Sequence, residues 1–362
     1  MENKIRNKII TISGEPASGK STVVKHLKSE YEKMGFNVHI ISVGHTFREL
    51  ARKEYLKMYP DKTDANLADI QTDPSFIARR DMIDKMVDGE VAKRGREINN
   101  IERPNDVYII DSRLAWSNVP ESYAVRLTVN QNIAGDRVFK DKTRGKEDQY
   151  DSLEQAITKT KERKLAEISR YKQRYGVDLT EPTNYDLIVD TSYSKSDELA
   201  DIIINGEEKY RRGDYYPKYW KSPALFIPSQ KIMETLSKSP IGTSMDNITK
   251  SIKENGYNPN LEVEAVEQEG ITILKDGHHR AIAALSAGKT LIPYFVEHRD
   301  DEFSKKYANG EIRLNDIYDW EDWVRYYSML GNIESLKNFN VRDVIDINKV
   351  VETPSMPVGD GR

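Results

Sequence analysis

The sequence predicts an α/β fold for its first 200 residues, in which a parallel sheet is flanked by helices. Short apolar runs alternate there with stretches of helical periodicity, as they do in βαβ units. A glycine-containing loop, Gly14-Glu15-Pro16-Ala17-Ser18-Gly19-Lys20-Ser21, joins the first apolar run to the first helical stretch. These observations place the loop at the carboxyl edge of the sheet, where folds of this class bind their ligands.

Each strand and helix of this part is predicted from the same alternation. The strand candidates are Lys8–Ile12, Asn37–Val43, Val107–Ile110, Ala124–Val129 and Asp186–Val189. The helix candidates are Ser21–Lys33, Phe47–Met58, Ser75–Lys93, Asn132–Lys140, Ser152–Tyr175 and Asp197–Tyr210. A turn-forming stretch at residues 211–217 then marks a domain boundary.

The composition narrows the class of protein. The chain has 362 residues, enough for two ordinary domains, and 38% of them are hydrophobic. It contains no cysteine, which excludes disulfides, thiolate zinc sites and thiol nucleophiles and fits a reducing cytoplasm. No run approaches the roughly 18 apolar residues of a membrane helix. The net charge of −4 neither requires nor excludes a nucleic-acid partner. We therefore expect a cytoplasmic protein without a membrane partner.

The loop fills every position of the phosphate-binding pattern G-x-x-x-x-G-K-[ST], which makes a chance match the weaker alternative. Backbone N–H groups of such a loop surround phosphate oxygens, and the helix N-terminus adds a favourable partial charge. Lys20 can reach the β and γ phosphates, and the Ser21 hydroxyl can bind Mg²⁺. We therefore expect ATP and Mg²⁺ at a site formed by Gly14, Glu15, Pro16, Ala17, Ser18, Gly19, Lys20, Ser21 and Thr22.

Two arginines follow strands of the predicted sheet. Arg48 lies shortly after the second strand, and Arg113 follows Asp111 at the end of the third. Both are therefore expected at the carboxyl edge. Further along, Arg163, Glu167 and Arg170 share one helical face, with the carboxylate between the two guanidinium groups. A solvated helix face is the alternative interpretation of Arg163 and Arg170.

Residues 8–210 resemble the cytidylate kinases, especially the compact archaeal type. The resemblance rests on the phosphate loop, on Gly44–Ala51 (G-x-x-F-R-E-L-A), on Asp111–Ala115, on the basic stretch Arg137–Arg144 and on Tyr185–Ser192. It implies a P-loop nucleoside-monophosphate-kinase fold with a core sheet, an acceptor-binding helical insert and a lid. It also implies that Arg48 and Arg113 hold the acceptor side and that Arg137, Arg163 and Arg170 converge on the transferring phosphoryl group. Catalysis would then rest on positioning and electrostatics.

The sequence departs from these kinases at two places on the acceptor side. Ser112 stands where a glycine is usual, between Asp111 and Arg113, and His45 has an atypical place before Phe47. His45 is a candidate acceptor ligand or, alternatively, the cap of a helix that starts near Phe47. Asp111 could bind Mg²⁺ through water, contact the acceptor, or act as a base for a hydroxyl acceptor, whereas a monophosphate acceptor needs no base.

The second half contains one sharp motif, Asp276-Gly277-His278-His279-Arg280, between an apolar strand and a helix of small residues. Two imidazoles and a guanidinium near a helix N-terminus suit an anion. With the helix–loop–strand pattern upstream, the motif resembles the ParB/sulfiredoxin-like domain, a smaller α+β fold that occurs in DNA-binding proteins, nucleases and phosphotransferases. The alternative is a domain kept for substrate binding or dimerisation, with His278 and His279 structural.

The domain organisation follows from these assignments. We expect a kinase domain at 1–212, a ParB/sulfiredoxin-like domain at 213–300, a helical extension at 301–352 and a disordered tail at 353–362. An aromatic cluster in the extension suits interdomain packing more often than base stacking. It consists of Trp320, Trp323, Tyr326 and Tyr327.

The combination resembles phage-type P-loop kinases that modify DNA bases, which would act in the host cytoplasm. We therefore expect a kinase that phosphorylates the hydroxyl of a 5-hydroxymethylpyrimidine in DNA, with the second domain gripping the polynucleotide. A free CMP or dCMP kinase is the alternative, because the first domain alone looks sufficient for that reaction. A nucleotide-gated DNA-binding switch is a third hypothesis, against which the set of lid arginines argues.

Overall fold

The structure is a computed structural model that describes residues 7–63, 70, 73–100, 102–141, 150–229, 235, 242–268 and 271–296. The expected helical extension, its aromatic cluster and the tail lie outside these residues. The chain forms two compact units. The first comprises Met1–Val129, Thr143–Val189 and Ser196–Tyr216, and the second comprises Asn130–Lys142, Asp190–Lys195 and Pro217–Arg362. The division into domains at 1–212 and 213–300 stays a prediction.

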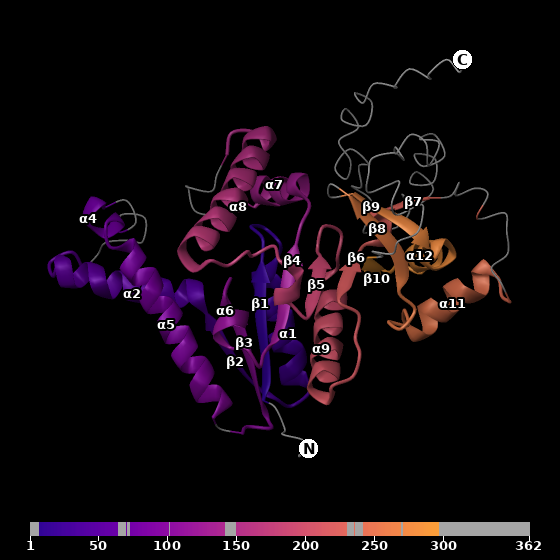
Figure 1. Cartoon of the computed structure of the whole chain (residues 1–362), viewed down its shortest axis with the longest axis horizontal. Helices are drawn as coiled ribbons and strands as arrows, with labels where there is room; N and C mark the ends of the chain where they lie inside the picture. Colours follow the sequence, from indigo (N-terminus) through magenta and orange to yellow (C-terminus); the bar gives the residue numbers. More distant parts are fainter. Residues whose placement is uncertain are drawn as a thin grey trace, which may run out of the picture. The chain divides into compact units, whose positions relative to one another are not determined.

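The first unit is built on the predicted parallel sheet (Figure 1). The strands are ordered β2 (Asn37–Ser42), β3 (Asp106–Asp111), β1 (Lys8–Gly14), β4 (Tyr123–Thr128) and β5 (Leu187–Asp190). The pairs β2–β3, β1–β3 and β1–β4 are all parallel. Their carboxyl ends therefore meet at one edge, where the phosphate loop leaves β1.

Helices flank this sheet as the alternation predicts. They are α1 (Lys20–Lys33), α2 (Val43–Met58), α4 (Pro74–Ile77), α5 (Arg80–Asn99), α6 (Ala115–Asn118), α8 (Leu153–Tyr175) and α9 (Ser196–Arg212), with a 3₁₀ turn, η2, at Pro182–Asn184. The apolar face of α1 is buried, and α1 packs against α9. The helices α2, α4 and α5 follow β2 and precede β3 in the chain, and Figure 1 shows them to the left of the sheet. The α/β fold with flanking helices is confirmed.

Two local predictions were wrong. The helix expected over Ser75–Lys93 is divided into α4 and α5 by a turn at Ala78–Arg79. The interpretation of His45 as a helix cap also fails, because β2 runs into α2 without a loop and the helix begins at Val43. His45 therefore lies inside α2.

The second unit contains a mixed sheet of short strands. Its order is β6 (Tyr219–Lys221), β10 (Ile292–Val296), β8 (Val263–Gln268), β9 (Ile271–Asp276) and β7 (Phe226–Pro228). The pairs β6–β10 and β8–β9 are antiparallel, whereas β8–β10 and β7–β9 are parallel. The helices of this unit include α7 (Gln131–Lys140), α11 (Met245–Asn255) and α12 (His278–Ser286), and a 3₁₀ turn, η3, lies at Pro223–Leu225. Among the described helices of both units, none is long and apolar enough to cross a membrane.

Candidate active site

The phosphate loop has the backbone that its motif requires. Ala17 and Gly19 adopt positive φ angles of 60° and 81°, and Gly19 immediately precedes α1. A Cβ added at Gly14 would lie 2.6 Å from Ser18 Oγ and 2.8 Å from Lys20 Cγ, so only glycine fits there. This turn carries the chain from β1 into the N-terminus of α1, where N–H groups and the helix dipole favour an anion.

Lys20 and Asp111 come together beside this loop. Parallel pairing aligns Asp111, the last residue of β3, with Ile12 of β1, two residues before β1 ends and the phosphate loop begins. The Lys20 Nζ atom lies 3.7 Å from Asp111 Oδ1. Burial and the Arg113 charge lower the pKa of Lys20 to about 8, although Asp111 opposes the shift. The site therefore contains Lys20, which loses its proton at a lower pH than an ordinary lysine, and the Asp111 carboxylate next to it.

Arg113 does not stand free at the acceptor side. Its Nε and Nη2 atoms donate to the two carboxylate oxygens of Glu167 at 3.0 and 3.2 Å. This bidentate geometry is the strong form of an arginine–carboxylate pair. The sequence places Glu167 between Arg163 and Arg170 but gives no sign of this partner, which lies 54 residues away.

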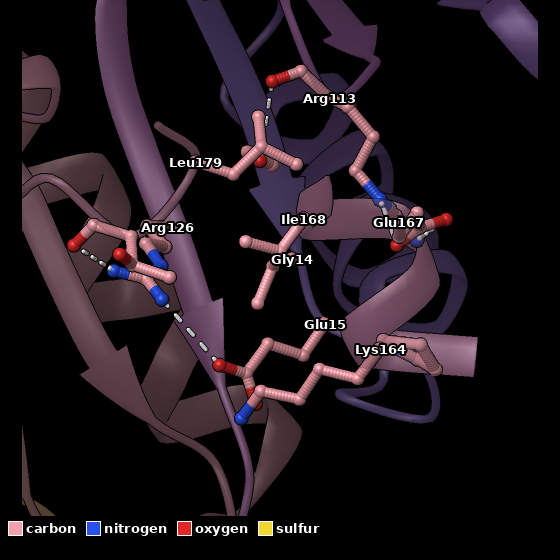
Figure 2. Close-up of a pocket in the computed structure, with 11 residues that line it drawn as sticks. Gly14, Glu15, Arg113, Arg126, Lys164, Glu167, Ile168 and Leu179 are labelled. Atoms are coloured by element: carbon pink, nitrogen blue, oxygen red, sulfur yellow. Dashed lines mark hydrogen bonds and ion pairs between the residues drawn. The ribbon is translucent and has the colours of Figure 1, made fainter. Parts of the chain in front are cut away.

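A second ion-pair cluster surrounds Glu15, inside the phosphate loop itself (Figure 2). Glu15 Oε2 lies 2.7 Å from Lys164 Nζ, and Glu15 Oε1 lies 3.4 Å from Arg126 Nη2. The backbone N–H of Val129 donates to Oε2 at 3.4 Å. One pocket, partly open to solvent, is lined by Arg113, Arg126, Lys164, Glu15 and Glu167.

Arg126 and Lys164 line the site, although no sequence motif indicates either of them. Arg126 is a cation in an apolar strand, a signal that could have suggested a role at the site. Lys164 is one cation among many on α8, and nothing in its spacing distinguishes it. Both residues reach the site through contacts with Glu15, more than a hundred residues away in the chain.

Arg163 and Arg170 lie on exposed positions of α8 and have different surroundings. Arg163 is close enough to Lys20 for its charge to lower the pKa of Lys20. The Arg170 guanidinium carbon lies 5.2 Å from the centre of the Tyr171 ring, and its charge lowers the pKa of Asp88 against a larger rise from burial. A common role for the two arginines at the phosphoryl group stays a prediction.

The remaining predicted kinase residues lie elsewhere or outside the described side chains. Arg137, on α7 of the second unit, donates through Nη2 to the carbonyl oxygens of Thr191 and Ser192 at 2.6 and 3.1 Å. Its expected place at the phosphoryl group stays a prediction. His45 and Arg48 belong to α2, but their side chains are not among those that the structure describes.

The donors expected for Mg²⁺ fit that ion. Ser21 lies in the first turn of α1 and is exposed, and Asp111 offers a carboxylate at the end of β3. Both present hard oxygen ligands, which Mg²⁺ prefers, and this ion completes its shell with waters and substrate phosphates. Among the described residues no group of three or more acidic, histidine or cysteine side chains is placed to hold a metal. The metal would therefore take its remaining ligands from waters and the triphosphate.

The D-G-H-H-R motif of the second unit is tied into its own fold. Gly277, with φ of 93°, precedes α12, and a Cβ there would lie 2.7 Å from Val263 Cγ1. Arg280 donates to the carbonyl oxygens of Leu261 and Glu262 at 3.0 and 2.8 Å and to Asp276 Oδ2 at 3.1 Å. The motif therefore fastens the start of α12 to the segment that enters β8.

The two histidines of the motif also have contacts within the unit. His278 is buried with its Nε2 atom 3.4 Å from Ser229 Oγ, and burial lowers its pKa to about 4. His279 Nε2 lies 3.2 Å from the carbonyl oxygen of Thr235 and donates to it. A neutral, buried His278 agrees with the structural alternative for this residue, and phosphate contacts by the motif stay a prediction.

Comparison with known proteins identifies the family of the first half. A family model described as an AAA domain matches residues 10–159. The cytidylate kinase of Methanocella arvoryzae is 30% identical over 56% of this chain and 99% of its own length. The cytidylate kinase of Sulfurisphaera tokodaii is 30% identical over 54% of this chain and 92% of its own length. An S-adenosylmethionine-dependent nucleotide dehydratase of Lacinutrix mariniflava is 28% identical over 55% of this chain but only 36% of its own. The chain therefore belongs to the cytidylate kinase family of P-loop kinases and is a phosphotransferase with ATP as donor.

Proposed function

We propose that the chain transfers the γ-phosphoryl group of ATP to the hydroxyl of a 5-hydroxymethylpyrimidine in DNA. The observation that carries the proposal is Asp111, whose carboxylate lies 3.7 Å from the phosphate-loop Lys20. A hydroxyl nucleophile benefits from a base at the transfer position, and a monophosphate acceptor does not need one. The hydroxymethyl oxygen attacks the γ phosphorus, its proton passes to Asp111, and ADP leaves with the bridging oxygen.

The charge of the acceptor side supports a neutral acceptor. Arg113, which the family resemblance assigns to an acceptor phosphate, is neutralised by the bidentate contact with Glu167. A monophosphate would have to displace that carboxylate before it could bind the guanidinium. A hydroxyl group on a base makes no such demand.

The other predicted residues receive the following roles. The loop from Gly14 to Thr22 holds the triphosphate, Lys20 binds its β and γ phosphates, and Ser21 binds the Mg²⁺ that accompanies it. Arg137, Arg163 and Arg170 stabilise the charge of the phosphoryl group in the transition state. His45, Arg48 and Arg113 contact the acceptor.

The second unit would bind the DNA. The D-G-H-H-R motif runs from Asp276, the last residue of β9, into the first turn of α12, a helix of small residues. This arrangement supports a ParB/sulfiredoxin-like assignment. In that proposal His279 and Arg280 contact phosphates, and Asp276 and Gly277 shape the turn. Arg280 would have to exchange part of its contacts with Asp276 for a phosphate oxygen.

The second candidate is a free CMP or dCMP kinase. It is favoured by the 30% identity to the cytidylate kinase of Methanocella arvoryzae, of which this chain covers 99%. In this case Arg113 exchanges Glu167 for the acceptor phosphate, and the second unit has another role.

Labelled ATP distinguishes the two candidates. The full chain is incubated with [γ-³²P]ATP, Mg²⁺ and one of CMP, dCMP or a duplex that contains 5-hydroxymethyluracil or 5-hydroxymethylcytosine. We expect label in the modified duplex and none in an unmodified duplex of the same sequence. Label in CMP or dCMP, with the modified duplex left unlabelled, contradicts the proposal and favours the free-nucleotide kinase.

The variant Asp111→Asn then tests the base. If the acceptor is a hydroxyl, turnover should fall on the order of 10²-fold while ATP still binds. Asp106→Asn is the matched control, because Asp106 lies at the other end of the same strand, away from the phosphate loop. Full activity of Asp111→Asn would remove the base from the mechanism.

A further inference from the structure

A carboxylate inside a phosphate-binding loop requires a reason, because it repels the anion that the loop binds. Glu15 directly follows the last residue of β1, and only 11% of its side chain is exposed. Two cations and a backbone N–H hold it: Lys164, Arg126 and Val129. Because opposite charges attract, these two cations offset the negative charge that Glu15 would otherwise present to a bound phosphate.

The two cations on Glu15 come from different elements. Arg126 belongs to β4, the neighbour of β1, and its Nη1 atom also donates to the carbonyl oxygen of Thr180 at 2.8 Å. It is therefore a fixed part of the core. Lys164 belongs to α8, so its contact with Glu15 fastens this helix to the phosphate loop (Figure 2).

A second ion pair fastens α8 one turn further on. Glu167 lies three residues after Lys164, on the same face of the helix, and binds Arg113 beyond the end of β3. Helix α8 therefore contacts the phosphate loop through the cation Lys164 and the end of β3 through the carboxylate Glu167. Two contacts of opposite polarity fix both the rotation of α8 and its position along its axis. Arg163 is the residue before Lys164 on this helix, and its charge lowers the pKa of Lys20.

We propose that Glu15 is a positioning residue that docks α8 onto the phosphate loop and thereby presents Arg163 to the transferring phosphoryl group. The Glu15–Lys164 pair sets the distance between helix and loop, and the Glu167–Arg113 pair sets the angle. The helix α8 is therefore part of a site that is already formed before ATP binds. This inference rests on the kinase assignment alone and is independent of the acceptor.

The test uses Glu15→Gln, Lys164→Met and the double variant in the full chain. Glutamine keeps the shape and an acceptor oxygen but removes the charge that holds Lys164. Lys161→Met, an exposed cation one turn earlier on the same helix, is the matched control. Three quantities are measured: amide hydrogen exchange of α8, affinity for the fluorescent analogue mant-ATP, and ADP formation from ATP with and without CMP.

Each single variant should raise hydrogen exchange in α8 about tenfold and lower ADP formation about tenfold, with mant-ATP affinity changed less than about threefold. The double variant should be no worse than either single variant, because the two residues act as one contact. The control should match the wild type. Hydrogen exchange is measured without a phosphoryl acceptor, so its result is valid even if the proposed DNA substrate is wrong.

Three results would overturn the inference. Unchanged exchange in α8 in both single variants means that the pair does not dock the helix. Tighter mant-ATP binding by Glu15→Gln, with turnover unchanged, means that Glu15 acts on the triphosphate directly. Additive losses in the double variant likewise separate the two residues and contradict a shared contact.

Discussion

Raising the pH removes the charge of Lys20 without altering the chain, and this perturbation tests the phosphate-loop assignment directly. Burial and the neighbouring Arg113 lower the pKa of Lys20 to about 8 in the free protein. Lys20 is then protonated in about nine molecules of ten at pH 7 and in about one of ten at pH 9. A bound triphosphate keeps the lysine charged, so binding above pH 8 requires a proton from solvent. ATP affinity should therefore fall about tenfold from pH 7 to pH 9, or about 1.4 kcal/mol.

The assay is a titration with mant-ATP at fixed Mg²⁺ and ionic strength, in half-unit steps of pH. The terminal phosphate, with a pKa near about 6, is already ionised over this range and contributes little. Lys20→Arg is the control, because a guanidinium does not titrate below about pH 12. A flat wild-type profile, or the same decline in Lys20→Arg, would refute the link between Lys20, burial and triphosphate binding.

Three further predictions concern α8 and the second unit. Arg163→Ala and Arg170→Ala should each lower kcat by tenfold or more with little loss of ATP affinity, because their contacts form in the transition state; unchanged turnover in both would support a solvated helix face. His278 has a pKa of about 4 in the fold against 6.5 unfolded, so the unfolded chain binds the extra proton between these values and stability falls as pH drops through this window. The loss, about 2 kcal/mol in urea unfolding at pH 4.5 against pH 7, should be smaller in His278→Gln. Gly277→Ala should cost more stability in thermal melts than Gly288→Ala, since both have positive φ but only Gly277 lacks space for a Cβ; equal costs would contradict the close approach.

Local patterns carried the predictions that succeeded. The phosphate loop and the start of α1 follow from eight consecutive residues, and each strand of the first unit follows from one apolar run. Asp111 ends an apolar run, which predicts its place at the edge of the sheet, and it lies there beside Lys20. Such features depend on neighbours in the chain, so the sequence contains them directly.

The missed features depend on partners that are distant in the chain. Glu167 pairs with Arg113, and Glu15 with Lys164, across 54 and 149 residues. A charged helix offers many equivalent cations, and only the folded position of α8 decides which one meets the loop. The cap assigned to His45 failed for a related reason, because the absence of a loop after β2 moves the start of α2 to Val43.

The route of the backbone between the two units limits how this protein can be divided. The chain enters the second unit at Asn130, leaves it after Lys142, returns for Asp190–Lys195 and returns again at Pro217. No single cut therefore yields two intact pieces, and a fragment that ends near residue 212 would keep α7 and Asp190–Lys195 without the part of their unit that begins at Pro217. Because the chain passes several times between the two units, unfolding of one unit should disturb the other. We therefore expect a single cooperative denaturation transition, whereas two domains joined by one linker would give two. Functional dissection of this chain is therefore better done with point substitutions than with truncations.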